Sequence, residues 1–224
     1  MTSSAAATAP PAPRRRRQNR DAEVLDAAIA VFCERGYAAA TLQDVAQTVG
    51  MLKGSLYYYF DSKEALLFRI LSDADEQVRV IFDETLALDV PAPERLRAFL
   101  LRHIQWYLEN LELARVTFHE WNNLTGELLE TQKQRRRDYD AFVQDLVRGC
   151  QQEGAVSADL PVTLATNYLL GAINSTPDWY RRDGAVTPVD LAALYTDLTI
   201  AMLSSWQPTA TTKSRRARRA GSSR

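Results

Sequence analysis

The chain has 224 residues, of which 46% are hydrophobic, which is enough for one large or two small domains with a real core. Its net charge is −1, and its two cysteines, Cys33 and Cys150, lack ligand spacing, which argues against a disulfide framework or a zinc site. No apolar stretch approaches the ~20 residues that span a bilayer, and no apolar signal region follows the first basic residues. We therefore expect a cytoplasmic protein with no membrane partner.

Both ends of the chain are basic, whereas its body is acidic. Eleven of the 27 Lys and Arg residues lie in residues 1–20 and 207–224, which contain no acid, and this leaves 16 basic and 28 acidic side chains elsewhere. We predict disordered basic segments at residues 1–19 and 207–224, whose arginines either contact phosphates or serve solubility. The acidic body should repel polyanions except at a local basic face.

Residues 20–66 have the pattern of a three-helix head. Apolar residues at helical spacing predict a first helix over 20–35, which Gly36 ends. Thr41 and Asp44 form a capping arrangement that opens a short helix, and Gly50 ends it. A second short helix follows with Met51, Leu52, Leu56 and Tyr59 on one side, and Asp61-Ser62 can cap a third. Two short helices around a glycine-containing turn predict a helix-turn-helix.

The second short helix carries residues that suit a DNA surface. A tyrosine ring packs against sugars and thymine methyl groups, and its hydroxyl donates to phosphate, which makes Tyr57 and Tyr58 candidates. Lys63 supplies a point charge, and Thr41, at a helix N-terminus, can donate to a phosphate beside backbone amides. Gly54 would permit close approach to the groove wall. The sequence therefore predicts that this helix reads DNA.

The run from Leu25 through Phe68 resembles the N-terminal DNA-binding domain of the TetR family of transcriptional regulators. About 45 residues agree in type and spacing, among them Gly54-Ser55-Leu56-Tyr57, Tyr59-Phe60 and Ser62-Lys63. Regulators of this family are all-helical homodimers whose larger C-terminal domain binds an effector, usually releasing DNA. The resemblance implies that the DNA contacts are Thr41, Lys53, Ser55, Tyr57, Tyr58, Tyr59 and Lys63.

Residues 67–206 read as a helical ligand-binding and dimerisation domain. A long helix from Ser62 to about Leu88 ends before Pro91, and further helices are predicted over 93–109, 111–122, 125–153, 159–182 and 188–206. The expected fold class is all-α, with a helix-turn-helix domain over 20–66 and this larger domain after it. Apolar stripes on the last two predicted helices, which include Leu164, Tyr168, Leu194 and Leu198, predict a homodimer interface of four helices. A dimer places two recognition helices in successive major grooves, so we expect a near-palindromic double-stranded operator.

A small-molecule effector would bind among aromatic and polar residues on these helices. The sequence-based candidates for its pocket are Trp106, Tyr107, Phe118, His119, Trp121, Asn122, Tyr139, Phe142 and Asn167. An enzyme is the weak alternative, because the two histidines stand on different predicted helices and no nucleophile motif, phosphate loop or metal-ligand cluster is present. We expect no catalytic residue, no metal and no cofactor.

The segment from Asn174 to Gly184 contains Trp-Tyr-Arg-Arg-Asp-Gly. It resembles a segment in TetR-like regulators of fatty-acid and steroid breakdown, some of which respond to acyl-CoA thioesters, and it adds Trp179 to the candidate ligand residues. Arg135-Arg136-Arg137 with Arg148, or Arg181-Arg182, could hold the phosphates of such a thioester. A solvated helix face is the alternative reading of those arginines. A neutral or cationic apolar effector, or no effector at all, stays open.

Overall fold

The structure is a computed structural model that describes residues 13–208, with side chains from Arg20 onward. It is all-helical over that range, as expected, and no strand occurs in it. The expectations for residues 1–12 and 209–224, most of the two basic segments, lie outside the described residues. The chain divides into two compact units, residues 1–70 and residues 71–224.

The first unit contains α1 (Pro13–Arg35), α2 (Leu42–Thr48), α3 (Lys53–Leu56) and the start of α4 (Lys63–Leu86). The first helix begins at Pro13, seven residues before its expected start, so residues 13–19 are helical. Val24, Phe32, Val45, Leu56 and Leu67 are buried in this unit. Gly36 and Gly50 have positive φ angles of 74° and 64°, a region that glycine occupies without steric cost. These two glycines end α1 and α2 where the sequence indicated.

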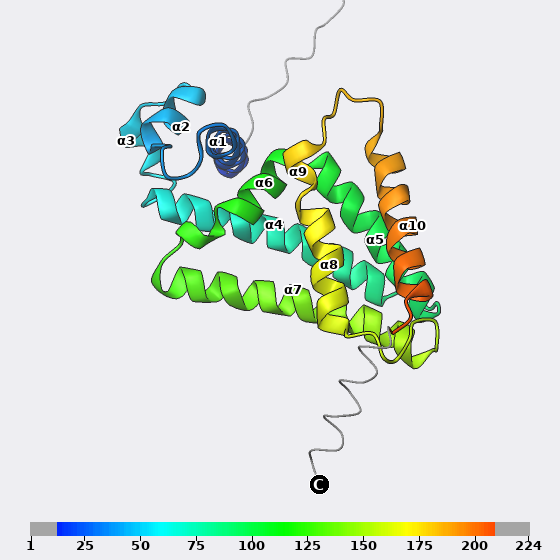
Figure 1. The fold of residues 1–224 in the computed structure, drawn as a ribbon. Coiled ribbons are helices and arrows are strands. Elements are labelled where there is room, and N and C mark those ends of the chain that lie inside the picture. The colour runs from blue at the N-terminus through cyan, green and yellow to red at the C-terminus, as the bar shows by residue number, and fades with distance from the viewer. Residues whose placement is uncertain (1–12, 209–224) are drawn as a thin grey trace, which may run out of the picture. The chain divides into compact units, whose positions relative to one another are not determined.

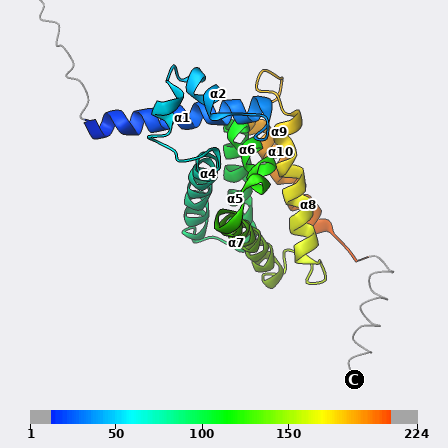
Figure 2. The same cartoon turned by 90° about the vertical axis from the view of Figure 1, so that its left-hand side faces the viewer.

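The second unit contains the rest of α4, α5 (Ala92–Glu109), α6 (Leu111–His119), a 3-10 turn η1 (Trp121–Asn123), α7 (Gly126–Gln152), α8 (Val162–Asn174), α9 (Thr176–Trp179) and α10 (Pro188–Ser205). Figure 1 shows α8 and α10 as two long helices joined through the short α9 and a loop. In Figure 2, α5 and α7 lie between the C-terminal part of α4 and α8.

The expected helix over 159–182 is two helices in the structure. Alpha-helix α8 ends at Asn174, and the four-residue α9 follows with Pro177 in its first turn. Proline has no N–H to donate to the carbonyl one turn earlier, and its ring clashes with the preceding turn, so it starts a helix more readily than it continues one. The expected helix over 111–122 likewise ends at His119 and continues as η1.

Aromatic side chains from three helices fill the centre of the second unit. Phe82 of α4 stacks on Phe142 of α7 with ring centroids 3.8 Å apart, and Phe99 of α5 meets Phe142 edge-on at 5.3 Å. Phe99 is fully buried. Burial of apolar area at ~25 cal/mol per Å² is the main stabilising contribution of such a cluster. No described helix is long and apolar enough to cross a bilayer.

Candidate DNA-binding surface and effector pocket

The N-terminus of α2 is fastened by a reciprocal cap. The Asp44 N–H donates to Thr41 Oγ1 (3.2 Å), while the Thr41 N–H donates to Asp44 Oδ2 (2.9 Å). This is the capping box expected from the sequence. The hydrogen bonds from the Thr41 side chain and backbone, with the nearby Arg35 guanidinium 2.7 Å away, lower the pKa of the Asp44 carboxyl. Thr41 is exposed. Its hydroxyl donates to Asp44 Oδ2 (2.7 Å), so its expected phosphate contact stays a prediction.

The α3 region is a single helical turn with an exposed outer surface. Lys53, Gly54 and Ser55 are exposed, and the side chains of Tyr57 and Tyr58 are 47% and 68% exposed. Leu56 is fully buried and holds the turn against the first unit. Tyr59 is half-buried, and its ring meets that of Tyr58 edge-on at 5.4 Å. Leu52 was expected on the buried side but is 81% exposed, because α3 begins only at Lys53 and Leu52 precedes it in extended backbone.

Lys63 has a structural role that the sequence did not indicate. Its ammonium donates to the carbonyl oxygens of Tyr37 (2.7 Å) and Ala40 (2.8 Å), and it lies 4.2 Å from the centre of the Tyr37 ring. Hydrogen bonds from a charged donor are about twice as strong as neutral ones. Lys63 therefore ties the start of α4 to the segment before α2, and its expected phosphate contact stays a prediction.

Gly54 offers a test of close approach that does not disturb the fold. Its φ is not positive, and a Cβ added there would meet no atom within 4 Å. We expect Gly54→Ala to leave the thermal midpoint unchanged or slightly higher, since alanine is the better helix former. If α3 lies against the groove wall, the same methyl group should weaken operator binding about tenfold, ~1.4 kcal/mol, in fluorescence anisotropy. Unchanged affinity would remove Gly54 from the contact surface.

A small cavity in the second unit is the candidate effector pocket. It has a volume of about 50 Å³ and lies among α4, α5, α6, α7 and the end of α8. Its lining consists of Ala74, Asp75, Val78, Trp106, Tyr107, Thr117, Phe118, Gln132, Arg135, Arg136, Tyr139, Asp140 and Asn174. The structure thus brings together four of the predicted ligand residues, Trp106, Tyr107, Phe118 and Tyr139.

The other predicted ligand residues lie elsewhere. Phe142 is in the stacked aromatic cluster, and Trp121 lies beside the cavity wall with its ring 4.7 Å from the Arg136 guanidinium carbon. Asn122 and Asn167 are exposed on η1 and α8, and His119 is 3.3 Å from the Asp178 carboxylate. Trp179 is 48% exposed, with its ring 6.2 Å from that of Tyr195. None of these side chains lines the cavity, and their ligand roles stay predictions.

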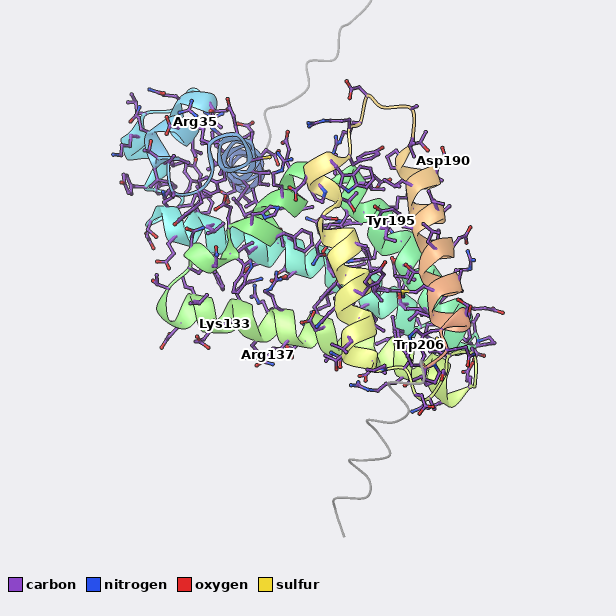
Figure 3. The ribbon with its side chains drawn as sticks, in the orientation of Figure 1. Arg35, Lys133, Arg137, Asp190, Tyr195 and Trp206 are labelled. Carbon is purple, nitrogen blue, oxygen red and sulfur yellow. The ribbon has the colours of Figure 1, made fainter. Side chains whose placement is uncertain are left out.

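One wall of the cavity carries a pair of opposite charges, Asp75 and Arg135, which the sequence did not indicate as neighbours. Asp75 of α4 lies 3.2 Å from the Arg135 guanidinium, which also donates to Ser72 (2.8 Å). Burial raises the pKa of the Asp75 carboxyl against the opposing effect of Arg135. Arg136 has no carboxylate oxygen within 4 Å among the described residues. The arginine run at 135–137 therefore holds one paired cation, one cation on an aromatic ring, and Arg137, which points away from the helices (Figure 3).

A buried polar chain borders the cavity. His103 is fully buried, and its Nε2 lies 2.8 Å from the Tyr139 hydroxyl, which in turn hydrogen-bonds that of Tyr107. Burial lowers the pKa of His103 to about 3 and raises those of Tyr107 and Tyr139. At neutral pH all three groups are uncharged, so they can orient a ligand only as hydrogen-bonding dipoles. Among the described residues, no group of three or more His, Cys, Asp or Glu side chains is placed to hold a metal ion.

A helix-turn-helix head with an exposed tyrosine-bearing turn, followed by a larger helical unit with a cavity among its helices, is the architecture of a DNA-binding transcriptional regulator. The chain belongs to the tetR family of bacterial regulatory proteins. The model of that family's N-terminal region matches residues 24–70, and the model described as a tetracyclin repressor-like C-terminal domain matches residues 89–203.

Named relatives extend over most of the chain. The chain is similar to the HTH-type transcriptional repressor KstR2 of Rhodococcus jostii strain RHA1, at 26% identity over 84% of this chain and 93% of that protein. It is also similar to the fatty acid metabolism regulator protein of Bacillus subtilis strain 168, at 26% identity over 77% and 88%. Its fold matches the crystal structure of AibR in complex with isovaleryl coenzyme A and operator DNA, with a TM-score of 0.73 and 24% identity over 83% and 98%. These likenesses confirm the predicted fold and class.

Proposed function

We propose that this regulator is a repressor that a small apolar effector releases from a near-palindromic operator in the cytoplasm. The observation that carries the proposal is the aromatic cavity of the second unit, with arginines in its lining and a helix, α4, that begins in the first unit. Effector in the cavity would contact α4 at Ala74, Asp75 and Val78. A ligand that favours one position of α4 over another shifts the protein between two states by its differential affinity for them.

An acyl-CoA thioester is the effector class that the site supports best. Trp106, Phe118 and Val78 supply apolar walls for an acyl group, while Arg136 is a cation without a carboxylate partner in the described part of the chain. Guanidinium groups bind phosphates through paired hydrogen bonds. The Bacillus subtilis relative is named for fatty acid metabolism, and AibR was solved with isovaleryl coenzyme A. Both names favour a thioester over a cationic effector.

Operator binding by fluorescence anisotropy tests this assignment. An operator fragment would be selected from random DNA and titrated with and without a panel of acyl-CoA thioesters and their free acids. Release by a thioester but not by its acid supports the proposal, and Arg136→Met should then raise the required thioester concentration. Lys133→Met is the matched control, since Lys133 lies on the same helix outside the cavity lining. Binding that no thioester changes would direct the search to neutral and cationic apolar ligands.

We also propose that the protein acts as a homodimer through α8 and α10. Leu164 and Tyr168 on α8 and Leu194 and Leu198 on α10 are more than half exposed, which is unusual for apolar side chains at regular helical spacing. A depression of about 370 Å³ between the two helices is lined by residues of both, including Tyr168, Leu198 and Met202. A second copy of the chain would cover this surface by packing its own α8 and α10 against it.

Leu198→Arg should convert the dimer to a monomer. Leu198 is 58% exposed, so the arginine costs the folded monomer little, but it places a like charge from each copy at the interface. Light scattering should report the mass of one chain, and operator affinity should fall about 100-fold as the second head loses its tether. Leu86→Arg, at a 60% exposed leucine at the end of α4, is the control and should stay dimeric. A Leu198→Arg protein that is still dimeric would place the interface elsewhere.

A further inference from the structure

Two buried hydrogen-bond acceptors in the cavity lining have no donor. Gln132 of α7 is 1% exposed, and its Oε1 atom has no partner among the described residues. Asn174, the last residue of α8, has a buried Oδ1 atom that also accepts no hydrogen bond from a described residue. Both residues line the cavity of about 50 Å³. Buried polar atoms in folded proteins are almost always satisfied, so each such acceptor requires an explanation.

The orientation of the Gln132 amide is set by its neighbour. Gln132 hydrogen-bonds the Asp75 carboxylate, which also accepts from Arg135 at 3.2 Å. An ionised carboxylate only accepts hydrogen bonds, so the amide nitrogen of Gln132 must face Asp75. The amide oxygen then has to turn away from Asp75. Its lack of a donor therefore follows from the Asp75 contact and not from an arbitrary assignment of the amide atoms.

The charges and size of the cavity limit which donor fits. An ammonium group would meet Arg136, whose guanidinium has no carboxylate oxygen within 4 Å in the part of the chain that the structure describes. Two acids line the cavity: Asp75 is already paired with Arg135, and Asp140 is influenced by the charge of Arg136. A volume of about 50 Å³ has room for a small group such as a hydroxyl but not for a whole acyl chain, so a larger effector binds only as the surrounding helices move apart. A neutral hydroxyl is the donor that meets both conditions, and the apolar walls of Val78, Trp106 and Phe118 indicate that it stands on a hydrophobic body.

We propose that the effector carries a hydroxyl group on its apolar part, and that this hydroxyl donates to Gln132 Oε1 or Asn174 Oδ1. The proposal rests on the proposed function of the cavity as the effector pocket, and it names the chemical feature by which that pocket selects its ligand. A pocket with a buried acceptor rejects the analogue without a hydroxyl, because binding that analogue leaves the acceptor without a partner.

The test compares three pairs of ligands with eight-carbon chains, and in each pair one member has a hydroxyl that the other lacks. They are 3-hydroxyoctanoyl-CoA and octanoyl-CoA, their two free acids, and the neutral pair 1-octanol and 1-chlorooctane. Binding to the full chain would be measured by calorimetry and by operator release. We expect the hydroxylated member of at least one pair to bind tenfold or more tightly, about 1.4 kcal/mol. Gln132→Met or Asn174→Leu should abolish that difference, whereas Gln134→Met, at an exposed glutamine on the same helix, should preserve it.

The possible results separate the two proposals. A hydroxyl preference only in the acid or neutral pair would support the hydroxyl proposal and reject the thioester as the effector class. Equal binding within every pair would overturn the hydroxyl proposal, but the protein would still be a regulator that responds to an effector. A hydroxyl preference that is unchanged in both Gln132→Met and Asn174→Leu would overturn it as well. The acceptors would then be satisfied by trapped water. Failure of all six ligands to bind would overturn the hydroxyl proposal and the thioester assignment, and the search would move to cationic apolar ligands.

Discussion

Acidification from pH 7.5 to 4.5 is expected to cost the protein about 3 kcal/mol of unfolding free energy through His103 alone. Burial lowers the pKa of His103 to about 3 in the folded protein, from an ordinary value of 6.5. Between these two values the unfolded chain binds a proton that the folded protein does not. The free energy of unfolding therefore falls by ~1.4 kcal/mol for each pH unit below 6.5, and His103 contributes no pH dependence above it.

The cause is the surroundings of the imidazole ring. Phe99 stacks on it at 5.0 Å, Tyr107 meets it edge-on at 4.5 Å, and the one hydrogen bond that it makes to a described residue is to Tyr139. Within residues 20–208 no carboxylate is near enough to compensate an imidazolium charge, so desolvation decides the shift.

Urea unfolding of the wild type and of His103→Gln at both pH values measures this effect. Glutamine keeps a hydrogen-bonding group for Tyr139 but does not titrate. Between pH 7.5 and 4.5 the unfolding free energy of the variant should fall by about 3 kcal/mol less than that of the wild type. Carboxyl groups lower the unfolding free energy of both proteins equally. Parallel losses in the two proteins would mean that His103 can take a proton in the folded state.

Replacing both Tyr57 and Tyr58 by alanine is expected to weaken operator binding about 100-fold. The two rings are about half and two-thirds exposed, so their removal should leave the thermal midpoint nearly unchanged. Each ring that packs on sugar or thymine methyl groups and donates to a phosphate should contribute ~1.4 kcal/mol. Anisotropy titrations against one operator fragment give the change directly.

Salt dependence separates the tyrosines from Lys53. A tyrosine hydroxyl displaces no counterion, so the slope of log affinity against log salt should be the same in the tyrosine variant and the wild type. Lys53→Ala should instead lower that slope by about one. Val80→Ala, at an exposed apolar position of α4, is the control for surface truncation. Full operator affinity in the tyrosine variant would remove α3 from the DNA contact.

The sequence predicted the head well because its signals are local. A capping box, a glycine with positive φ and apolar spacing act over a few residues, so Thr41, Asp44, Gly36 and Gly50 could be placed from sequence alone. Leu52 was misplaced because the helical periodicity was extended to two residues that precede the start of α3. The break between α8 and α9 was also missed, although Pro177 stands there and residues 174–178 carry no large apolar side chain.

The pocket was harder to predict because its residues come from helices far apart in the chain. Aromatic content pointed to Trp106, Phe118 and Tyr139, but it selected Trp121, Phe142 and Trp179 equally, since large rings serve the core as readily as a ligand. Asp75, Gln132 and Asn174 were missed. Polar residues on helices are common on surfaces, and their meeting around one cavity depends on tertiary packing that periodicity does not report.

The two hydrogen bonds from the Lys63 ammonium determine how motion along α4 can reach the head. They join the first turn of α4 to the carbonyl oxygens of Tyr37 and Ala40, immediately before α2. The beginning of α4 is therefore tied to the helix-turn-helix by side-chain hydrogen bonds as well as by the chain itself. A displacement of the first turn of α4 would therefore pull on the backbone that leads into α2.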